Sequence, residues 1–66
     1  MQITVNGEVH NFAQSLSLDE LLHSLALTEG RIAVEVNGEI VPRSQFTEHQ
    51  INDLDKIEIV QAIGGG

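Results

Sequence analysis

Two Asn-Gly dipeptides, Asn6-Gly7 and Asn37-Gly38, each lie between stretches in which apolar and polar residues alternate. Asn and Gly tolerate the positive φ angles that a two-residue turn between antiparallel strands requires. The first dipeptide predicts a hairpin with one strand over 1–5 and a return strand from residue 8 or 9 to about 12. The second predicts strands over 31–36 and 39–41. The chain is therefore predicted to be built on two β-hairpins.

The segment between the hairpins has the periodicity of a helix. Four leucines share one face because they follow the spacing i, i+3, i+4 and i+7: Leu18, Leu21, Leu22 and Leu25. Ser17 and Glu20 have the spacing of a capping box, in which each residue bonds to the backbone of the other. The pattern predicts a helix from Leu18 to Leu25 or Ala26.

A last alternating stretch predicts a fifth strand over 56–61. The predicted order is strand, strand, helix, strand, strand, strand. The helix then covers one face of a mixed five-stranded sheet, with the last strand central and parallel to the first. This α+β arrangement is the β-grasp, or ubiquitin-like, fold. We predict a β-grasp domain over 1–61 and a flexible C-terminal tail over 62–66.

Length and charge limit the function. Sixty-six residues allow one small domain, in which a substrate pocket of its own is hard to fit. Ten acidic residues against three basic ones give a net charge of −7, which argues against binding to nucleic acid or to anionic membranes. The chain has no cysteine, no membrane-spanning apolar run and no signal peptide pattern, so we expect a cytoplasmic protein.

The internal polar residues do not predict a catalytic or metal site. Asp53 and Asp55 are predicted to lie in a solvated turn, because they lack the spacing of a calcium loop. His23 is predicted on the polar face of the helix, and His10 as a partly buried histidine near the sheet edge. Neither histidine has metal-ligand spacing.

The C-terminal Gly64-Gly65-Gly66 is the feature that suggests chemistry. Glycine loses much entropy when it is ordered, so three of them contribute little to a fold. Without a Cβ, Gly64 and Gly65 can pass through a narrow channel of a partner and present the Gly66 carboxylate. The alternative is a frayed end without function. Val60 and Ile63 are predicted to form an apolar partner patch beside this tail.

The whole chain resembles the ThiS family of ubiquitin-like sulfur carriers. The most specific part is the run Asn-Gly-Glu-Ile-Val-Pro-Arg within 36–46, and the opening Met-Gln-Ile-Thr-Val-Asn-Gly and the Asp-Lys-Ile-Glu-Ile-Val before the tail also fit. Two departures are Leu54, where many relatives have glycine, and a triple glycine where many have a pair.

The resemblance implies a reaction sequence carried out by partners. A ThiF-like adenylyltransferase uses ATP and Mg²⁺ to convert the Gly66 carboxylate to an acyl-adenylate. A persulfide donor then supplies sulfur, which leaves a thiocarboxylate, and a ThiG-like thiazole synthase takes this sulfur for the thiazole ring of thiamine. The carrier itself is expected to bind no cofactor and to be no enzyme.

Three alternatives remain open. The small subunit of molybdopterin synthase shares the fold and the thiocarboxylate, although it is typically longer. A ubiquitin-like modifier would use the same activation but would form an isopeptide bond with a lysine. A plain binding module would carry the glycines by accident.

Overall fold

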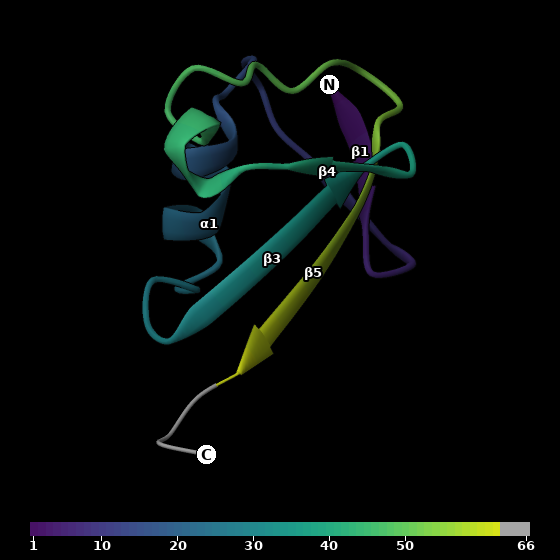
Figure 1. The fold of residues 1–66 in the computed structure, drawn as a ribbon. Coiled ribbons are helices and arrows are strands. Elements are labelled where there is room, and N and C mark those ends of the chain that lie inside the picture. The colour runs from purple at the N-terminus through teal and green to yellow at the C-terminus, as the bar shows by residue number, and fades with distance from the viewer. Residues whose placement is uncertain (63–66) are drawn as a thin grey trace.

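The structure, a computed structural model, describes residues 1–62. Five strands form one sheet, and a single α-helix among these residues packs against one face of it (Figure 1). The elements in chain order are β1 (Gln2–Val5), β2 (Glu8–Asn11), α1 (Leu18–Ser24), β3 (Arg31–Val36), β4 (Glu39–Val41), a 3₁₀ turn (Arg43–Gln45) and β5 (Lys56–Ala62).

The strand order in the sheet is β2-β1-β5-β3-β4. β5 is central, parallel to β1 and antiparallel to β3. The predicted fold is therefore confirmed: a mixed five-stranded sheet carries one helix on one face. β5 extends to Ala62, one residue beyond the predicted strand, because Ala62 still pairs with Arg31 of β3.

Both Asn-Gly dipeptides form the predicted tight turns. Asn6 has φ 50° and Gly7 has φ 84°, and Asn37 and Gly38 have φ 52° and 85°. Two successive residues with positive φ match the turn whose twist suits a β-hairpin. The first turn sets the pairing of Val5 with Glu8, and each hairpin keeps the register that its alternation predicts.

The helix begins where the capping box predicts. The Ser17 hydroxyl accepts a bond from the Glu20 N–H at 3.1 Å, and the Ser17 N–H donates to the Glu20 carboxylate at 2.8 Å. These two bonds satisfy backbone donors that a helix start otherwise leaves unpaired. They also hold the pKa of Glu20 below its usual value, since both bonds favour the ionised carboxylate.

The helix ends earlier than predicted, at Ser24. Ala26 has φ 58°, so the backbone there is left-handed and the helix cannot continue. The Leu27 N–H bonds to the Leu22 carbonyl at 2.8 Å, and the Ala26 N–H to the His23 carbonyl at 3.0 Å. This pair of bonds is the Schellman motif, in which the left-handed position is usually glycine. At seven residues, this helix is too short to cross a membrane.

The core lies between α1 and the inner face of the sheet. Its buried apolar side chains come from every strand except β2, from α1 and from the loop before β5. They are Ile3, Val5, Leu18, Leu21, Leu22, Val34, Val36, Val41, Phe46, Ile51, Ile57 and Ile59. Phe12, the aromatic side chain after β2, is partly buried against this cluster.

The prediction of a solvated turn for Asp55 is wrong. Asp55 is only 7% exposed, and its carboxylate accepts bonds from the Asn37 side-chain amide at 2.9 Å and from the Asn52 N–H at 2.8 Å. These donors replace the water that a buried carboxylate loses. Asp53 does remain exposed, and it accepts a bond from the Gln2 N–H at 2.7 Å. The two aspartates are thus structural groups that fasten the loop before β5.

Candidate functional site: the C-terminal strand and the open sheet face

β5 fixes the part of the chain from which the predicted tail continues. It pairs with β3 from Ile57 as far as Ala62, and with β1 at its first two residues. β5 is therefore central in the sheet at its start, whereas the residues directly before the tail are paired with β3. Ile63, Gly64, Gly65 and Gly66 lie outside the described residues, so the roles assigned to them above stay predictions.

Val60 lies on the sheet face opposite α1, as its alternation with the buried Ile57 and Ile59 predicts. Its side chain is 69% exposed. On the neighbouring strand it faces Ala33, which is also exposed. This half of the predicted patch is thus placed where a partner can reach it, and its role in binding stays a prediction.

The open face carries a second apolar side chain that the sequence analysis missed. Ile40 of β4 is 75% exposed and stands opposite Glu35 of β3. In the structure Val41 enters the core, so its neighbour Ile40 points to the opposite face. The predicted strand over 39–41 did not by itself show which of these two apolar residues is buried. Val60, Ala33 and Ile40 together are called the open-face patch below.

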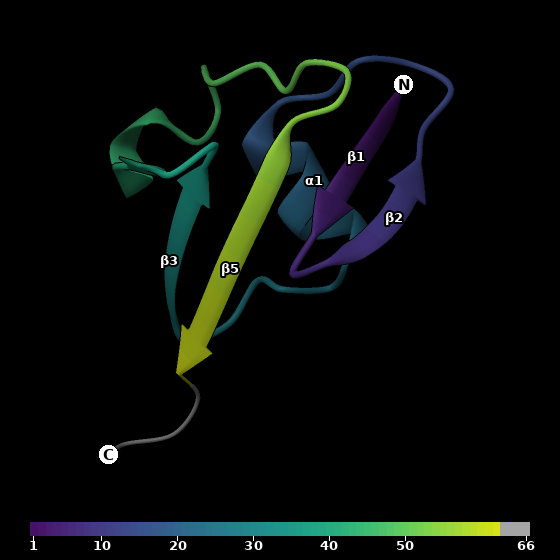
Figure 2. The ribbon, with the colours of Figure 1, turned by 90° about the vertical axis from the view of Figure 1, so that its right-hand side faces the viewer.

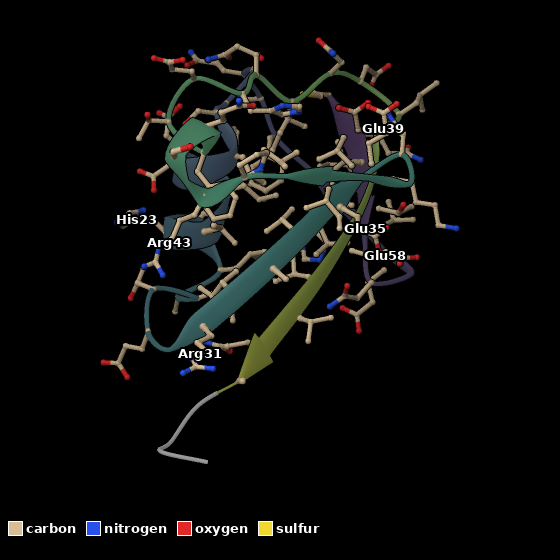
Figure 3. The ribbon with its side chains drawn as sticks, viewed as in Figure 1. His23, Arg31, Glu35, Glu39, Arg43 and Glu58 are labelled. Atoms are coloured by element: carbon tan, nitrogen blue, oxygen red, sulfur yellow. The ribbon has the colours of Figure 1, made fainter. Side chains whose placement is uncertain are left out.

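Acidic side chains lie beside the open-face patch. Glu35 and Glu58 are directly paired across β3 and β5, and Figure 3 shows both of them on the side of the sheet away from α1. Like charges in directly opposed positions destabilise a sheet. Lys56, whose Nζ lies 3.9 Å from the Glu58 carboxylate, offsets part of this repulsion. An apolar patch with an acidic rim suits a partner surface with basic residues.

The two histidines occupy the predicted environments. His23 is exposed on α1, with Nδ1 2.9 Å from the Asp19 carbonyl oxygen and 3.6 Å from the Asp19 carboxylate. His10 is partly buried and stacks on Phe12, with 6.5 Å between ring centroids. Among residues 1–62, no group of three or more potential ligands could hold a metal ion.

A hollow of about 200 Å³ lies on the helix side, between α1, the loop after it and the 3₁₀ turn. Its wall is mainly apolar, with Leu22, Leu27, Ile32 and Phe46, and Arg43 at its edge. It is smaller than the 300 Å³ or so at which ligand pockets usually begin. It also lies across the sheet from the open-face patch, so it does not form part of the candidate site.

The sequence analysis also missed the function of the Asn6 side chain. Its amide bonds to both backbone groups of Ile59 in β5, with Oδ1 accepting at 2.7 Å and Nδ2 donating at 3.1 Å. The turn already accounted for an asparagine at this position, so the sequence offered no separate signal for a contact across 53 residues.

A family model, a relative and a solved structure all indicate the same family for this chain. The model of the ThiS family matches residues 3–66. The chain is 36% identical to sulfur carrier protein ThiS of Escherichia coli (strain K12), over the full length of both chains. The crystal structure of the thiamine biosynthesis protein ThiS from Geobacter metallireducens superposes with a TM-score of 0.84, at 36% identity and with full coverage of both chains.

Longer proteins contain a segment similar to this chain. It is 46% identical over 66 residues to a thiazole synthase of Paramagnetospirillum magneticum, and it spans only 20% of that protein's length. A thiazole synthase of Magnetococcus marinus is 38% identical over 66 residues, again with 20% of its length covered.

Proposed function

This chain belongs to the ThiS family, and we propose that it is a sulfur carrier of thiamine biosynthesis whose working group is the C-terminal carboxylate of Gly66. The observation that carries the proposal is the full-length match to the sulfur carrier of E. coli, which includes the glycine end. The fold supports it, because β5 is paired with β3 as far as Ala62, four residues before Gly66.

Activation by a partner is required because a carboxylate is a poor electrophile. An α-carboxyl group has an ordinary pKa of about 3.3–3.7, so it is ionised at neutral pH. A ThiF-like adenylyltransferase, with ATP and Mg²⁺, transfers AMP to the Gly66 carboxylate and releases pyrophosphate. The acyl carbon then carries a good leaving group and accepts a nucleophile.

Sulfur enters from a persulfide on a donor protein. The terminal persulfide sulfur attacks the acyl carbon of Gly66 and AMP leaves. A thiol then attacks the donor's sulfur and forms a disulfide with it, so that the S–S bond to the carrier breaks and the thiocarboxylate leaves as the reduced product. The chain has no cysteine, so it cannot divert the sulfur onto a side chain of its own.

A ThiG-like thiazole synthase is the proposed acceptor of the sulfur. The two thiazole synthases that contain a segment similar to this chain support that assignment, because proteins that are joined in one chain commonly act on the same substrate. In this proposal the chain is a substrate and carrier rather than an enzyme. Its own contribution is to bind partners through the open-face patch and to present the glycines.

The main alternative is the small subunit of a molybdopterin synthase, which would use the same thiocarboxylate. The family match and the names of the relatives favour the thiazole assignment. A ubiquitin-like modifier would differ in its product, since its C-terminus would be joined to a lysine of another protein.

Intact mass spectrometry tests the proposal. The purified chain is incubated with a ThiF-type adenylyltransferase of the encoding organism, ATP, Mg²⁺ and a persulfide donor. The expected product is a chain in which one oxygen is replaced by sulfur, and fragmentation places the change at Gly66. A chain that stays unchanged with active partners contradicts the proposal. Addition of thiazole synthase and its small-molecule substrates should return the carboxylate form, whereas attachment to a lysine would indicate a modifier.

A further inference from the structure

The backbone of β5 bonds alternately to its two neighbours. The Lys56 carbonyl accepts a bond at 2.8 Å from the Asn37 N–H, which follows β3. The Ile57 carbonyl accepts one at 2.9 Å from the Asn6 N–H, which follows β1. Even-numbered residues of β5 therefore direct their N–H and C=O toward β3, and odd-numbered residues direct theirs toward β1.

β1 is too short to satisfy all the odd-numbered residues. It ends at Val5, after which the chain turns away into β2. The Asn6 side chain then continues the ladder by one step, since its amide both accepts from the Ile59 N–H and donates to the Ile59 carbonyl. The backbone N–H and C=O groups on this side of β5 are therefore paired as far as Ile59.

Gln61 is the next residue whose backbone points to that side. Within residues 1–62 no backbone or side-chain group bonds to its N–H or C=O on this side. Its side chain is directed elsewhere and bonds to the Glu29 carbonyl at 2.9 Å. Figure 2 shows the C-terminal half of β5 extending past the hairpin of β1 and β2. Among the described residues, the C-terminal end of β5 therefore has β3 on one side and an open edge on the other.

We propose that this open edge at Gln61 binds an extended segment of the activating adenylyltransferase, which adds a strand beside β5. This inference rests on the proposed function and names how its first partner is held. Main-chain bonds supply affinity in such strand addition, and side chains of the added strand contact the faces of the sheet. Val60 of the open-face patch lies directly beside Gln61 and is available for that second contact.

A strand bound at this edge would position the predicted tail for reaction. An extended chain advances about 3.3–3.6 Å per residue, and a misplacement of about 1 Å at a reacting group can reduce the rate about 100-fold. A partner strand that pairs with Gln61 fixes the chain one residue before the predicted tail. It would set the direction in which the glycines enter the active site.

Charge favours a partner enzyme over a second copy of this chain at the edge. Each copy carries a net charge of −7, and Glu58 lies on β5 itself, near the edge, with Glu35 of β3 opposite it on the other side. Two copies joined there would bring like charges together. An adenylyltransferase segment with basic side chains near the added strand would be attracted instead.

The Gln61→Pro variant tests the inference. Proline removes the Gln61 N–H, which bonds to no group within residues 1–62, and proline is tolerated at a strand edge whose N–H faces outward. We expect the dissociation constant for a ThiF-type adenylyltransferase of the encoding organism, measured by calorimetry, to rise about tenfold or more. Gln61→Ala is the matched control: it loses the contact with Glu29 but keeps the backbone, and its affinity should stay within about twofold of the wild-type value.

A chemical variant covers the case in which Gln61→Pro does not fold. In a synthetic chain, an ester replaces the amide between Val60 and Gln61, which removes the Gln61 N–H and also makes the Val60 carbonyl, which faces β3, a weaker acceptor. We expect this chain to melt somewhat below the wild-type temperature, to remain folded at room temperature, and to bind the adenylyltransferase more weakly. Wild-type affinity for the ester chain would overturn the inference.

The outcomes separate this inference from the proposed function. If the wild-type chain gains sulfur and the ester chain binds equally well, the edge inference fails and the proposed function stands. If the wild-type chain neither binds nor is adenylated, both fail. A wild-type dimer in sedimentation that Gln61→Pro disrupts would show that a second copy occupies the edge, and this too would overturn the inference.

Discussion

We expect the Ala26→Gly substitution to make the folded protein more stable. Ala26 is the second residue after α1, following the C-cap Leu25; it has φ 58° and occupies the left-handed position of the Schellman motif. A left-handed conformation costs an L-residue about 1–2 kcal/mol because Cβ approaches the next carbonyl oxygen. Glycine has no Cβ and avoids this cost.

The gain is smaller than this cost because glycine also makes the unfolded chain more disordered. That effect opposes folding by about 0.4–1 kcal/mol. Ala26 is exposed, so its methyl group contributes little packing that could be lost. We therefore expect Ala26→Gly to raise the free energy of unfolding by about 0.5–1 kcal/mol. For a domain of this size the melting temperature should rise by roughly 2–8 °C.

Ala33→Gly is the matched control. The chemical change is the same and Ala33 is also exposed, but it lies within β3 and does not have a positive φ. Glycine there should cost about 0.5–1 kcal/mol. Thermal and urea unfolding of the two variants should give shifts of opposite sign. If Ala26→Gly is no more stable than wild type while Ala33→Gly is destabilised, the account of how α1 ends is refuted.

Three further predictions concern the cap, the patch and the tail. Bonding to Ser17 lowers the pKa of Glu20. The ionised Glu20 carboxylate therefore stabilises the fold above its unfolded pKa of about 4.5, and this stabilisation disappears as pH falls through the lower folded value. The melting temperature of Glu20→Gln should depend less steeply on pH below about pH 5 than that of the wild type, and an unchanged dependence would contradict this. Val60→Asp should weaken adenylyltransferase binding about tenfold or more with little change in the melting temperature, because it places a charge in the centre of an apolar contact. The control is Val9→Asp, two strands away at a side chain that is 57% exposed, and it should leave the binding unchanged. Equal effects at both sites would argue against a local patch. Deletion of Gly66 moves the carboxylate back by up to about 3.3–3.6 Å and should abolish ATP–pyrophosphate exchange without changing the melting temperature; undiminished exchange would reject Gly66 as the activated residue.

The sequence allowed the local elements to be predicted because their signals are local. Each Asn-Gly dipeptide carries the geometry of its turn, and Ser17 with Glu20 marks the start of α1 within four residues. The end of α1 was predicted too late because Ala26, a good helix former, occupies a position where glycine is the usual signal.

Long-range polar contacts could not be predicted in the same way. The burial of Asp55 depends on the Asn37 amide, 18 residues away, and the extended ladder of β5 depends on the Asn6 amide, 53 residues away. In both cases the asparagine already had a sufficient local explanation in its turn. The exposure of Val60 followed from alternation alone, whereas the functions of Ile63 and of the three glycines lie beyond what residues 1–62 can test.

The place of β5 between the two hairpins also determines when this domain can fold during its synthesis. β1 can pair with β2, and β3 with β4, as soon as each hairpin has emerged from the ribosome. The two hairpins share no ladder, however, and only β5 bonds to both. This pairing closes a loop between residues as far apart as Asn6 and Ile59, which is entropically costly and slow to form. The two hairpins therefore stay unconnected until Lys56–Ala62 has been made, and an isolated hairpin is only marginally stable in water. A partner that recognises β5 within the sheet would thus select molecules that have completed folding.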